Sequence, residues 1–152
     1  MKRFFALLFL AVIAASLARA ETPKIEAVTA KDEDSKPTDT FAADVPKIYA
    51  FFRSTGTKKG DILRSVWVAD DVGEAAPKGT KIDEATLTAD KDDFFGAFSL
   101  SKPTKGWPLG QYHVDIYSGD QLATSVKFTV KAGKNSDDAD DDDDDKDDTK
   151  SD

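Results

Sequence analysis

Short apolar runs separated by clusters of turn-forming residues extend from residue 24 to residue 131. Where the pattern is clearest, apolar and polar positions alternate with a period of two, which is typical of β-strands with one buried face. The runs predict seven strands, at residues 24–30, 46–53, 62–69, 80–88, 94–100, 111–117 and 121–131. No stretch after residue 20 has a convincing helical pattern. The chain is therefore predicted to be all-β, a seven-stranded antiparallel β-sandwich.

The last two predicted strands, joined by the tight turn Ser118-Gly119-Asp120, show the alternation best. In the first of them, one face carries Tyr112, Val114 and Ile116, and the other carries His113, Asp115 and Tyr117. In the second, the face expected to be buried carries Leu122, Val126, Phe128 and Val130. Burial of an apolar side chain of this size stabilises a fold by about 1.5–3 kcal/mol before conformational entropy is subtracted.

Two segments carry a family resemblance. Residues 107–117 have the sequence WPLGQYHVDIY and precede a strand containing Phe128-Thr129-Val130. Further upstream the chain has the spacing Phe41-x-x-Asp44-x-Pro46-x-Ile48-Tyr49. Over about 95 residues the chain resembles the immunoglobulin-like and fibronectin type III-like domains of bacterial envelope proteins, a likeness of fold that carries no functional site with it.

Two aromatic residues fit this resemblance. Trp67 lies midway along the third predicted strand, where immunoglobulin-like domains often bury a tryptophan. Tyr112 follows Gly110-Gln111 at the start of the sixth, where a tyrosine corner is expected. The chain departs from true immunoglobulin domains because it has no cysteine, so no disulfide can link the two sheets.

Other aromatic side chains are expected on the surface. If Ile48, Ala50 and Phe52 point into the core, then Tyr49 and Phe51 point outward, and the same alternation places Phe95 outside. The second and fifth strands of an immunoglobulin-like sandwich are neighbours in one sheet, so these three side chains are predicted to form one exposed patch. Alternatively, the segment around Phe41 covers the patch, or the register is reversed.

Trp107 lies in a loop rich in proline and glycine at one end of the predicted sandwich. It is a candidate binding residue because an exposed indole can stack on a sugar or anchor a partner. The alternative is that Trp107 caps the core, because a large aromatic ring beside a strand packs well.

The N-terminus has the three parts of a secretory signal peptide. Lys2 and Arg3 precede the uncharged apolar run at residues 4–17, and Ala18-Arg19-Ala20 supplies small residues before the expected cleavage site. The 14 residues of that run are fewer than the ~20 that a membrane-spanning helix needs. The predicted organisation is a signal peptide at residues 1–20, a sandwich at residues 21–135 and an acidic tail at residues 136–152. The mature chain is expected to be periplasmic or secreted, with no membrane span.

The charge is concentrated at the C-terminus. Residues 136–152 contain 11 Asp and 2 Lys, whereas residues 21–135 contain 16 basic and 18 acidic residues. A run of like charges is expected to stay disordered and to repel nucleic acid. It lacks the glycine and glutamate of an EF-hand loop, so a solubilising role is favoured, with weak attraction of calcium or of a basic partner as the alternative.

Catalytic constellations are sparse. His113 is the single histidine, and it shares a face with Asp115, but no serine lies in a recognisable nucleophile turn. Two pairs of carboxylates, Asp70-Asp71 and Asp92-Asp93, read most simply as turn residues. No zinc ligand spacing and no phosphate-binding loop is present, so no resident cofactor and no enzymatic activity are expected.

Three functions are compatible with the sequence. The first is a non-catalytic interaction module of the bacterial envelope, with a protein or other envelope component as partner. The second is a carbohydrate-binding module that presents Trp107, Tyr49 and Tyr117 to a polysaccharide. The third is a cation-responsive protein whose active part is the acidic tail.

Overall fold

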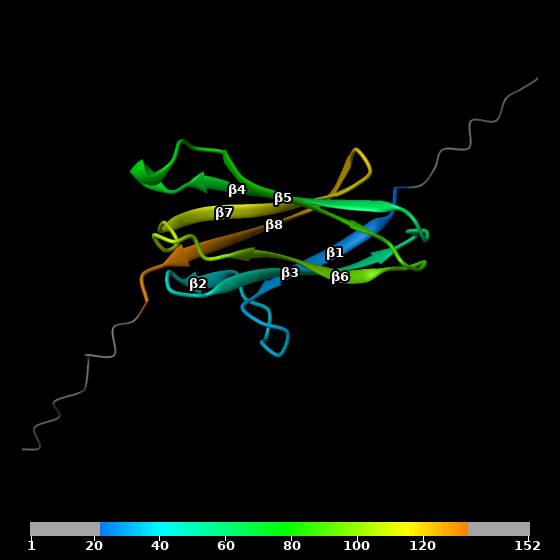
Figure 1. The fold of residues 1–152 in the computed structure, drawn as a ribbon, viewed down its shortest axis with the longest axis horizontal. Coiled ribbons are helices and arrows are strands. Elements are labelled where there is room, and N and C mark those ends of the chain that lie inside the picture. The colour runs from blue at the N-terminus through cyan, green and yellow to red at the C-terminus, as the bar shows by residue number, and fades with distance from the viewer. Residues whose placement is uncertain (1–21, 134–152) are drawn as a thin grey trace, which may run out of the picture.

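The computed structural model describes residues 22–133, which fold into two packed β-sheets (Figure 1). The elements are β1 (Lys24–Ala30), β2 (Thr40–Ala42), β3 (Lys47–Thr55), β4 (Ile62–Asp71), the 3₁₀ turn η1 (Gly73–Ala75), β5 (Thr80–Thr88), β6 (Phe95–Ser101), β7 (Gly110–Ser118) and β8 (Gln121–Lys131). One sheet has the order β1-β3-β6 and the other has the order β2-β8-β7-β4-β5. The all-β sandwich is therefore confirmed, while the predicted signal peptide and the predicted acidic tail lie outside the described residues.

The strand count differs from the expected seven because a short strand precedes β3. β2 pairs in parallel with the end of β8, and Phe41 at its centre is buried against Phe128 at a ring separation of 5.7 Å. Phe41 thus belongs to the core. β4 also runs two residues further than expected, so Asp70 and Asp71 end a strand instead of forming a turn.

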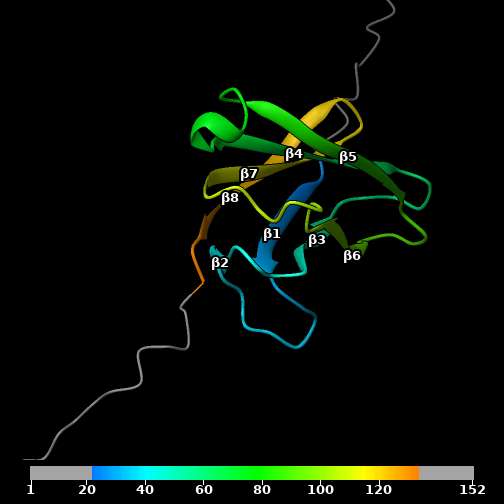
Figure 2. The ribbon, with the colours of Figure 1, turned by 60° about the vertical axis from the view of Figure 1, so that its left-hand side comes forward.

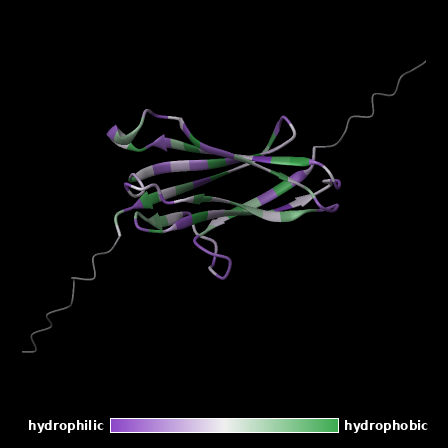
Figure 3. Cartoon of the chain, viewed as in Figure 1, coloured by the Kyte–Doolittle hydropathy of each residue, from purple (hydrophilic) through white to green (hydrophobic). Residues whose placement is uncertain are grey.

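The core lies between the two sheets and is built from the inward positions of the long strands. Trp67 is fully buried at the centre of β4, as the sequence predicts, and its ring packs edge-on against Phe128. On the opposite sheet, Ile48, Ala50 and Phe52 of β3 are all buried. Figure 2 shows the two layers from the side, and the loop between β1 and β2 extends away from them as a hydrophilic segment (Figure 3).

One expectation about the last hairpin is wrong. Leu122 is 53% exposed, although the alternation places it on the buried face. The β7–β8 register shifts between Ile116 and Tyr117, where Ala123 is an extra residue on β8. An extra residue reverses the facing of every position beyond it, so Leu122 pairs with Tyr117 on the outer face.

A tyrosine corner fixes the start of β7, as the sequence predicts. The Tyr112 hydroxyl donates a hydrogen bond of 2.6 Å to the Pro108 carbonyl, and burial raises the pKa of this phenol to about 12. The neighbouring Gly110 has φ +147°, and a Cβ there would lie 2.1 Å from the Asp71 carbonyl oxygen. Only glycine allows β7 to begin so close to the end of β4.

Carboxylates tie the two loops at the opposite end together. Asp92 accepts a hydrogen bond from the Lys59 backbone N–H at 2.9 Å, and Asp93 accepts one from Gly56 at 2.8 Å. The backbone N–H of Lys59 and the side-chain ammonium of Lys58 lower the pKa of Asp92. These contacts agree with the interpretation of Asp92-Asp93 as turn residues.

Candidate functional site

The outward face of the β1–β3–β6 sheet carries the predicted aromatic side chains. Antiparallel pairing sets Phe51 between Val28 of β1 and Ala97 of β6. One neighbouring row along β3 sets Arg53 between Glu26 and Phe95. The neighbouring row on the other side of Phe51 sets Tyr49 between Ala30 and Ser99. The central row and its aromatic neighbours, namely Val28, Tyr49, Phe51, Phe95 and Ala97, are called the aromatic face below.

The members of the aromatic face differ in exposure. Phe95 is 63% exposed and Val28 is 43% exposed, whereas Tyr49 and Phe51 are half-buried. The inward neighbours on the same strands, Phe52 and Phe98, are buried. The structure therefore brings together three of the four predicted site residues on one surface, and Phe41 does not cover them.

The rings of Tyr49 and Phe51 stack on each other, with centroids 5.4 Å apart and planes 11° apart. The Lys47 ammonium lies 5.6 Å from the Tyr49 ring centroid, and the Lys91 ammonium lies 4.4 Å from that of Phe95. Each cation sits against an electron-rich ring face, an attraction of about 0.5–1 kcal/mol at an exposed site. The aromatic face thus has a basic border.

A shallow hollow of about 340 Å³ opens between β1 and β6 at the Phe95 end of this face. Its lining residues are Glu26, Ala27, Val28, Phe51, Phe52, Arg53, Phe95 and Gly96. Gly96 pairs with Phe52 on the inward side of the sheet, where a Cβ would approach the buried Phe52 ring to 3.1 Å. The hollow can accept an apolar side chain bordered by both an acidic and a basic group.

The structure separates Trp107 from the other predicted site residues. Trp107 is 4% exposed, and its indole N–H donates a hydrogen bond of 2.8 Å to the Val45 carbonyl. Its ring packs edge-on against Tyr112 with centroids 6.2 Å apart. Trp107 is therefore a cap over the core and not an exposed binding residue, because the loop folds back over the end of the sandwich.

The three aromatic side chains that the carbohydrate hypothesis needs are not presented together. Trp107 is buried, and Tyr117 lies on the other sheet, half-buried, with the Arg64 guanidinium 4.2 Å from its ring centroid. Tyr49 gives one ring face to Phe51. No flat platform of these three rings is available for stacking on a sugar.

The outward face of the five-stranded sheet carries a group of polar side chains around His113. His113 lies between two carboxylates there, with Nδ1 2.6 Å from Asp70 and Nε2 3.4 Å from Asp115. Sequence spacing indicated Asp115, but Asp70 was missed because it reaches His113 only through the pairing of β4 with β7. Within residues 22–133, no hydroxyl group is hydrogen-bonded to His113, although Ser125 and Lys127 line the same shallow hollow as His113 and Asp70.

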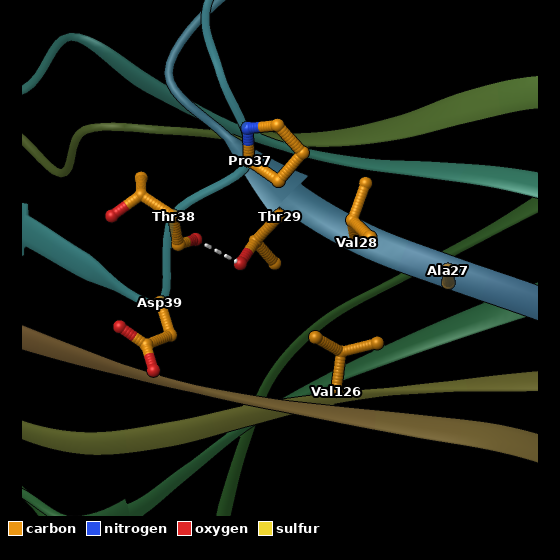
Figure 4. Close-up of a pocket in the computed structure, with 7 residues that line it drawn as sticks. All are labelled: Ala27, Val28, Thr29, Pro37, Thr38, Asp39 and Val126. Carbon is orange, nitrogen blue, oxygen red and sulfur yellow. Dashed lines mark hydrogen bonds between the residues drawn. The ribbon is translucent and has the colours of Figure 1, made fainter.

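A second shallow hollow lies where the edges of the two sheets meet, between β1 and β8 (Figure 4). It measures about 440 Å³ and is lined by Ala27, Val28, Thr29, Pro37, Thr38, Asp39 and Val126. The Thr29 hydroxyl donates a hydrogen bond of 2.6 Å to the Thr38 carbonyl, which links two of the lining residues (Figure 4). The loop that leads into β2 is thereby held against the outer edge of β1.

Within residues 22–133, no group of three or more histidine, cysteine or carboxylate side chains is arranged to hold a metal ion. The alternative of weak calcium binding concerns residues 136–152, which lie outside that range. The same range contains no helix long and apolar enough to span a bilayer.

The architecture is similar to that of several solved structures, all at low sequence identity. An immunoglobulin-like protein from Pseudomonas aeruginosa is 16% identical with a TM-score of 0.48, and the match covers 74% of this chain and 99% of that one. An alkylpurine DNA glycosylase from Pseudomonas fluorescens is 13% identical with a TM-score of 0.46, covering 73% and 31%. A β-glucosidase from Listeria innocua is 10% identical with a TM-score of 0.46, covering 73% and 16%.

The chain therefore spans nearly the whole of the first of these proteins and less than a third of the other two. No protein-family model matches it, and no curated protein matches it. The sheet order itself shows an all-β sandwich of two sheets, whereas the resemblance to immunoglobulin-like and fibronectin type III-like domains stays a prediction.

Proposed function

We propose that this chain is an exported, non-catalytic interaction module of the bacterial envelope, and that it binds a protein partner through the aromatic face. One observation carries the proposal. On a regular sheet whose other side is the core, Phe95 and Val28 remain 63% and 43% exposed beside the stacked pair Tyr49 and Phe51. Contiguous apolar surface of this kind marks a site of interaction.

The chemistry of the border indicates what kind of surface fits. Lys47 and Lys91 lie against the aromatic rings, and Arg53 pairs with Phe95 across the strands. A partner with an apolar side chain for the hollow and acidic groups around it matches this pattern, because aromatic anchors ringed by polar groups are typical of protein interfaces. A polysaccharide fits less well, since the rings of Tyr49 and Phe51 stack on one another.

Export rests on the sequence of residues 1–20, which has the parts of a signal peptide. Fractionation of a bacterial host that expresses the full-length chain tests this part of the proposal. Recovery of a processed chain that begins near Glu21 in the periplasm or medium supports it, whereas an unprocessed cytoplasmic product contradicts it.

Binding is tested by chemical crosslinking and capture from an envelope extract. The purified chain is compared with Phe51→Ser, with Leu122→Ser and with a version that ends at Asn135. Leu122→Ser is the matched control, because Leu122 is an exposed apolar residue on the other sheet. The proposal predicts a protein that is captured by the parent chain and by Leu122→Ser but lost with Phe51→Ser.

Two other outcomes reassign the function. Loss of the captured protein only in the shortened chain would move binding to the acidic residues after 135. If no version captures a protein and the parent chain is retained on envelope polysaccharide, the carbohydrate hypothesis is favoured. The sugar would then bind at a surface that does not include Trp107.

A further inference from the structure

The outer edge of β6 offers unpaired backbone groups. On its inner side, the Phe94 carbonyl accepts a hydrogen bond from Ser54 N–H, and Lys102 N–H donates to the Pro46 carbonyl. Hydrogen-bonded pairs alternate along an antiparallel ladder, so the even-numbered residues of β6 face β3 and the odd-numbered ones face away. The N–H and C=O groups of Phe95, Ala97, Ser99 and Ser101 therefore point to the free edge.

None of these four residues has a backbone or side-chain hydrogen bond on that edge to any residue between 22 and 133. The sequence of β6, FGAFSLS, contains no charged residue and no proline, and its register with β3 has no bulge. Charges, prolines and bulges are the usual means by which proteins prevent an edge strand from pairing with another chain. β6 uses none of them over seven residues.

The other long edges of the sandwich are protected. The β5 edge carries Lys81, Asp83 and Glu84 and has a bulge, because Ile82 is an extra residue on β5 where the register with β4 shifts. The β1 edge is covered in part, since the Thr29 carbonyl accepts a hydrogen bond from Thr38 N–H. β6 is therefore the edge strand best able to pair with an additional strand.

The topology leaves a strand position empty beside β6. In constant-type immunoglobulin sandwiches the corresponding sheet has four strands, and a fourth strand pairs at this edge. Here β5 belongs to the other sheet, and the chain passes from it directly into β6 (Figure 1). The three-stranded sheet consequently ends at β6.

We propose that β6 pairs antiparallel with β6 of a second copy of this chain, so that the two three-stranded sheets become continuous. A register centred on Phe98 sets Ala97 opposite Ser99 of the second copy and Phe95 opposite Ser101 of the second copy. The four residues of each copy whose N–H and C=O groups point to the free edge then gain backbone hydrogen-bond partners. This proposal rests on the backbone edge and goes beyond the proposed function, which rests on side chains of the aromatic face.

Two features favour a second copy as the occupant. The residues brought together are small or aromatic and uncharged, so the pairing sets no like charges opposite each other. The antiparallel arrangement also keeps the C-terminal ends of the two sandwiches apart. Ser101 pairs with Lys47 at the end of the sandwich where Gly133 lies near Asp44, and the two copies point these ends in opposite directions.

Sedimentation equilibrium of the full-length chain, recovered from an expressing bacterial host, tests the pairing. The parent chain is compared with the double variant Ala97→Lys/Ser99→Lys, which sets lysines opposite lysines across the proposed edge. Thr86→Lys/Thr88→Lys is the matched control, because it adds the same charge to exposed positions of β5. The expected result is a dimer for the parent and the control at about 100 µM, and half that mass for the β6 variant.

A second measurement guards against a β6 variant that fails to fold. The chain has no cysteine, so a mixture of Ala97→Cys and Ser99→Cys chains can be oxidised to report the register. Hydrogen-bonded antiparallel partners lie about 5.5 Å apart at Cα, within disulfide range. A mixed 97–99 disulfide between chains is expected, with none from a Thr86→Cys and Thr88→Cys mixture.

Three results would overturn the proposal. They are a parent chain that stays monomeric at about 1 mM, a dimer whose mass is unchanged by Ala97→Lys/Ser99→Lys, and an absence of the 97–99 disulfide. Phe51→Ser separates this idea from the proposed function, because it removes a side chain of the aromatic face and leaves the β6 edge intact. A Phe51→Ser chain that dimerises but captures no partner would support both.

Discussion

Phe95 and Phe98 provide a direct test of which side of β6 faces solvent. The two residues have the same side chain, lie three positions apart on one strand and point to opposite faces. Phe95 is 63% exposed and Phe98 is 3% exposed. Replacing each in turn with alanine compares an aromatic group on the surface with one in the core.

The expected costs follow from burial. Full burial of a phenylalanine side chain is worth about 1.5–3 kcal/mol, so the buried third of Phe95, together with its contact with Lys91, gives about 1 kcal/mol. Phe98→Ala removes a buried ring that stacks on Phe52 with centroids 5.4 Å apart. Leaving a cavity of that size in the core costs about 3–5 kcal/mol.

Urea unfolding followed by tryptophan fluorescence measures both costs, because Trp67 and Trp107 are buried in the folded chain. All samples are compared at one low protein concentration, since self-association would add to the apparent stability. A free energy of unfolding that falls by more than about 2 kcal/mol in Phe95→Ala would refute the assignment of Phe95 to an open surface.

The remaining predictions concern the start of β7 and the turn that follows it. Gly110→Ala should destabilise the fold by more than about 3 kcal/mol, because a Cβ would lie 2.1 Å from the Asp71 carbonyl oxygen. Gly119→Ala, at φ +56° with open space around it, should cost only about 1 kcal/mol, and equal costs in thermal unfolding would contradict this reasoning. Tyr112→Phe should cost about 1–2 kcal/mol through loss of the hydrogen bond to Pro108. The folded state favours the protonated Tyr112 phenol, whose pKa rises from 10.0 to about 12, so its contribution is complete below pH 10 and falls as pH rises toward 12. Tyr112→Phe should lack that part of the pH dependence in unfolding measured between pH 9 and pH 12.

Period-two alternation was sufficient to predict the faces of β3 and β6. Because Ile48, Ala50 and Phe52 are apolar at every second position, burial of that set leaves Tyr49 and Phe51 outside, as the structure confirms. The pairing of β3 with β6, also confirmed, followed from the expected sandwich topology.

Features that depend on exact register or on the path of a loop were beyond the sequence. The bulge at Ala123 changes the face on which Leu122 lies, and the residue type at position 123 does not predict a bulge. Trp107 is buried because its loop returns to the Val45 carbonyl, a contact across 62 residues. The contact of His113 with Asp70 likewise depends on how β4 and β7 align.

The central claim is that the aromatic face is an interaction surface, and site-specific photocrosslinking in living cells tests it most directly. A benzophenone amino acid replaces Phe95 in one version of the chain and Leu122 in another, both of them exposed apolar positions on different sheets. The account predicts a discrete adduct with a second protein from position 95 that is missing from position 122. An adduct of twice the chain's own mass would indicate contact between two copies at β6 and would not count as an adduct with a second protein. Identical adducts from both positions, or no heterologous adduct from position 95, would contradict the claim.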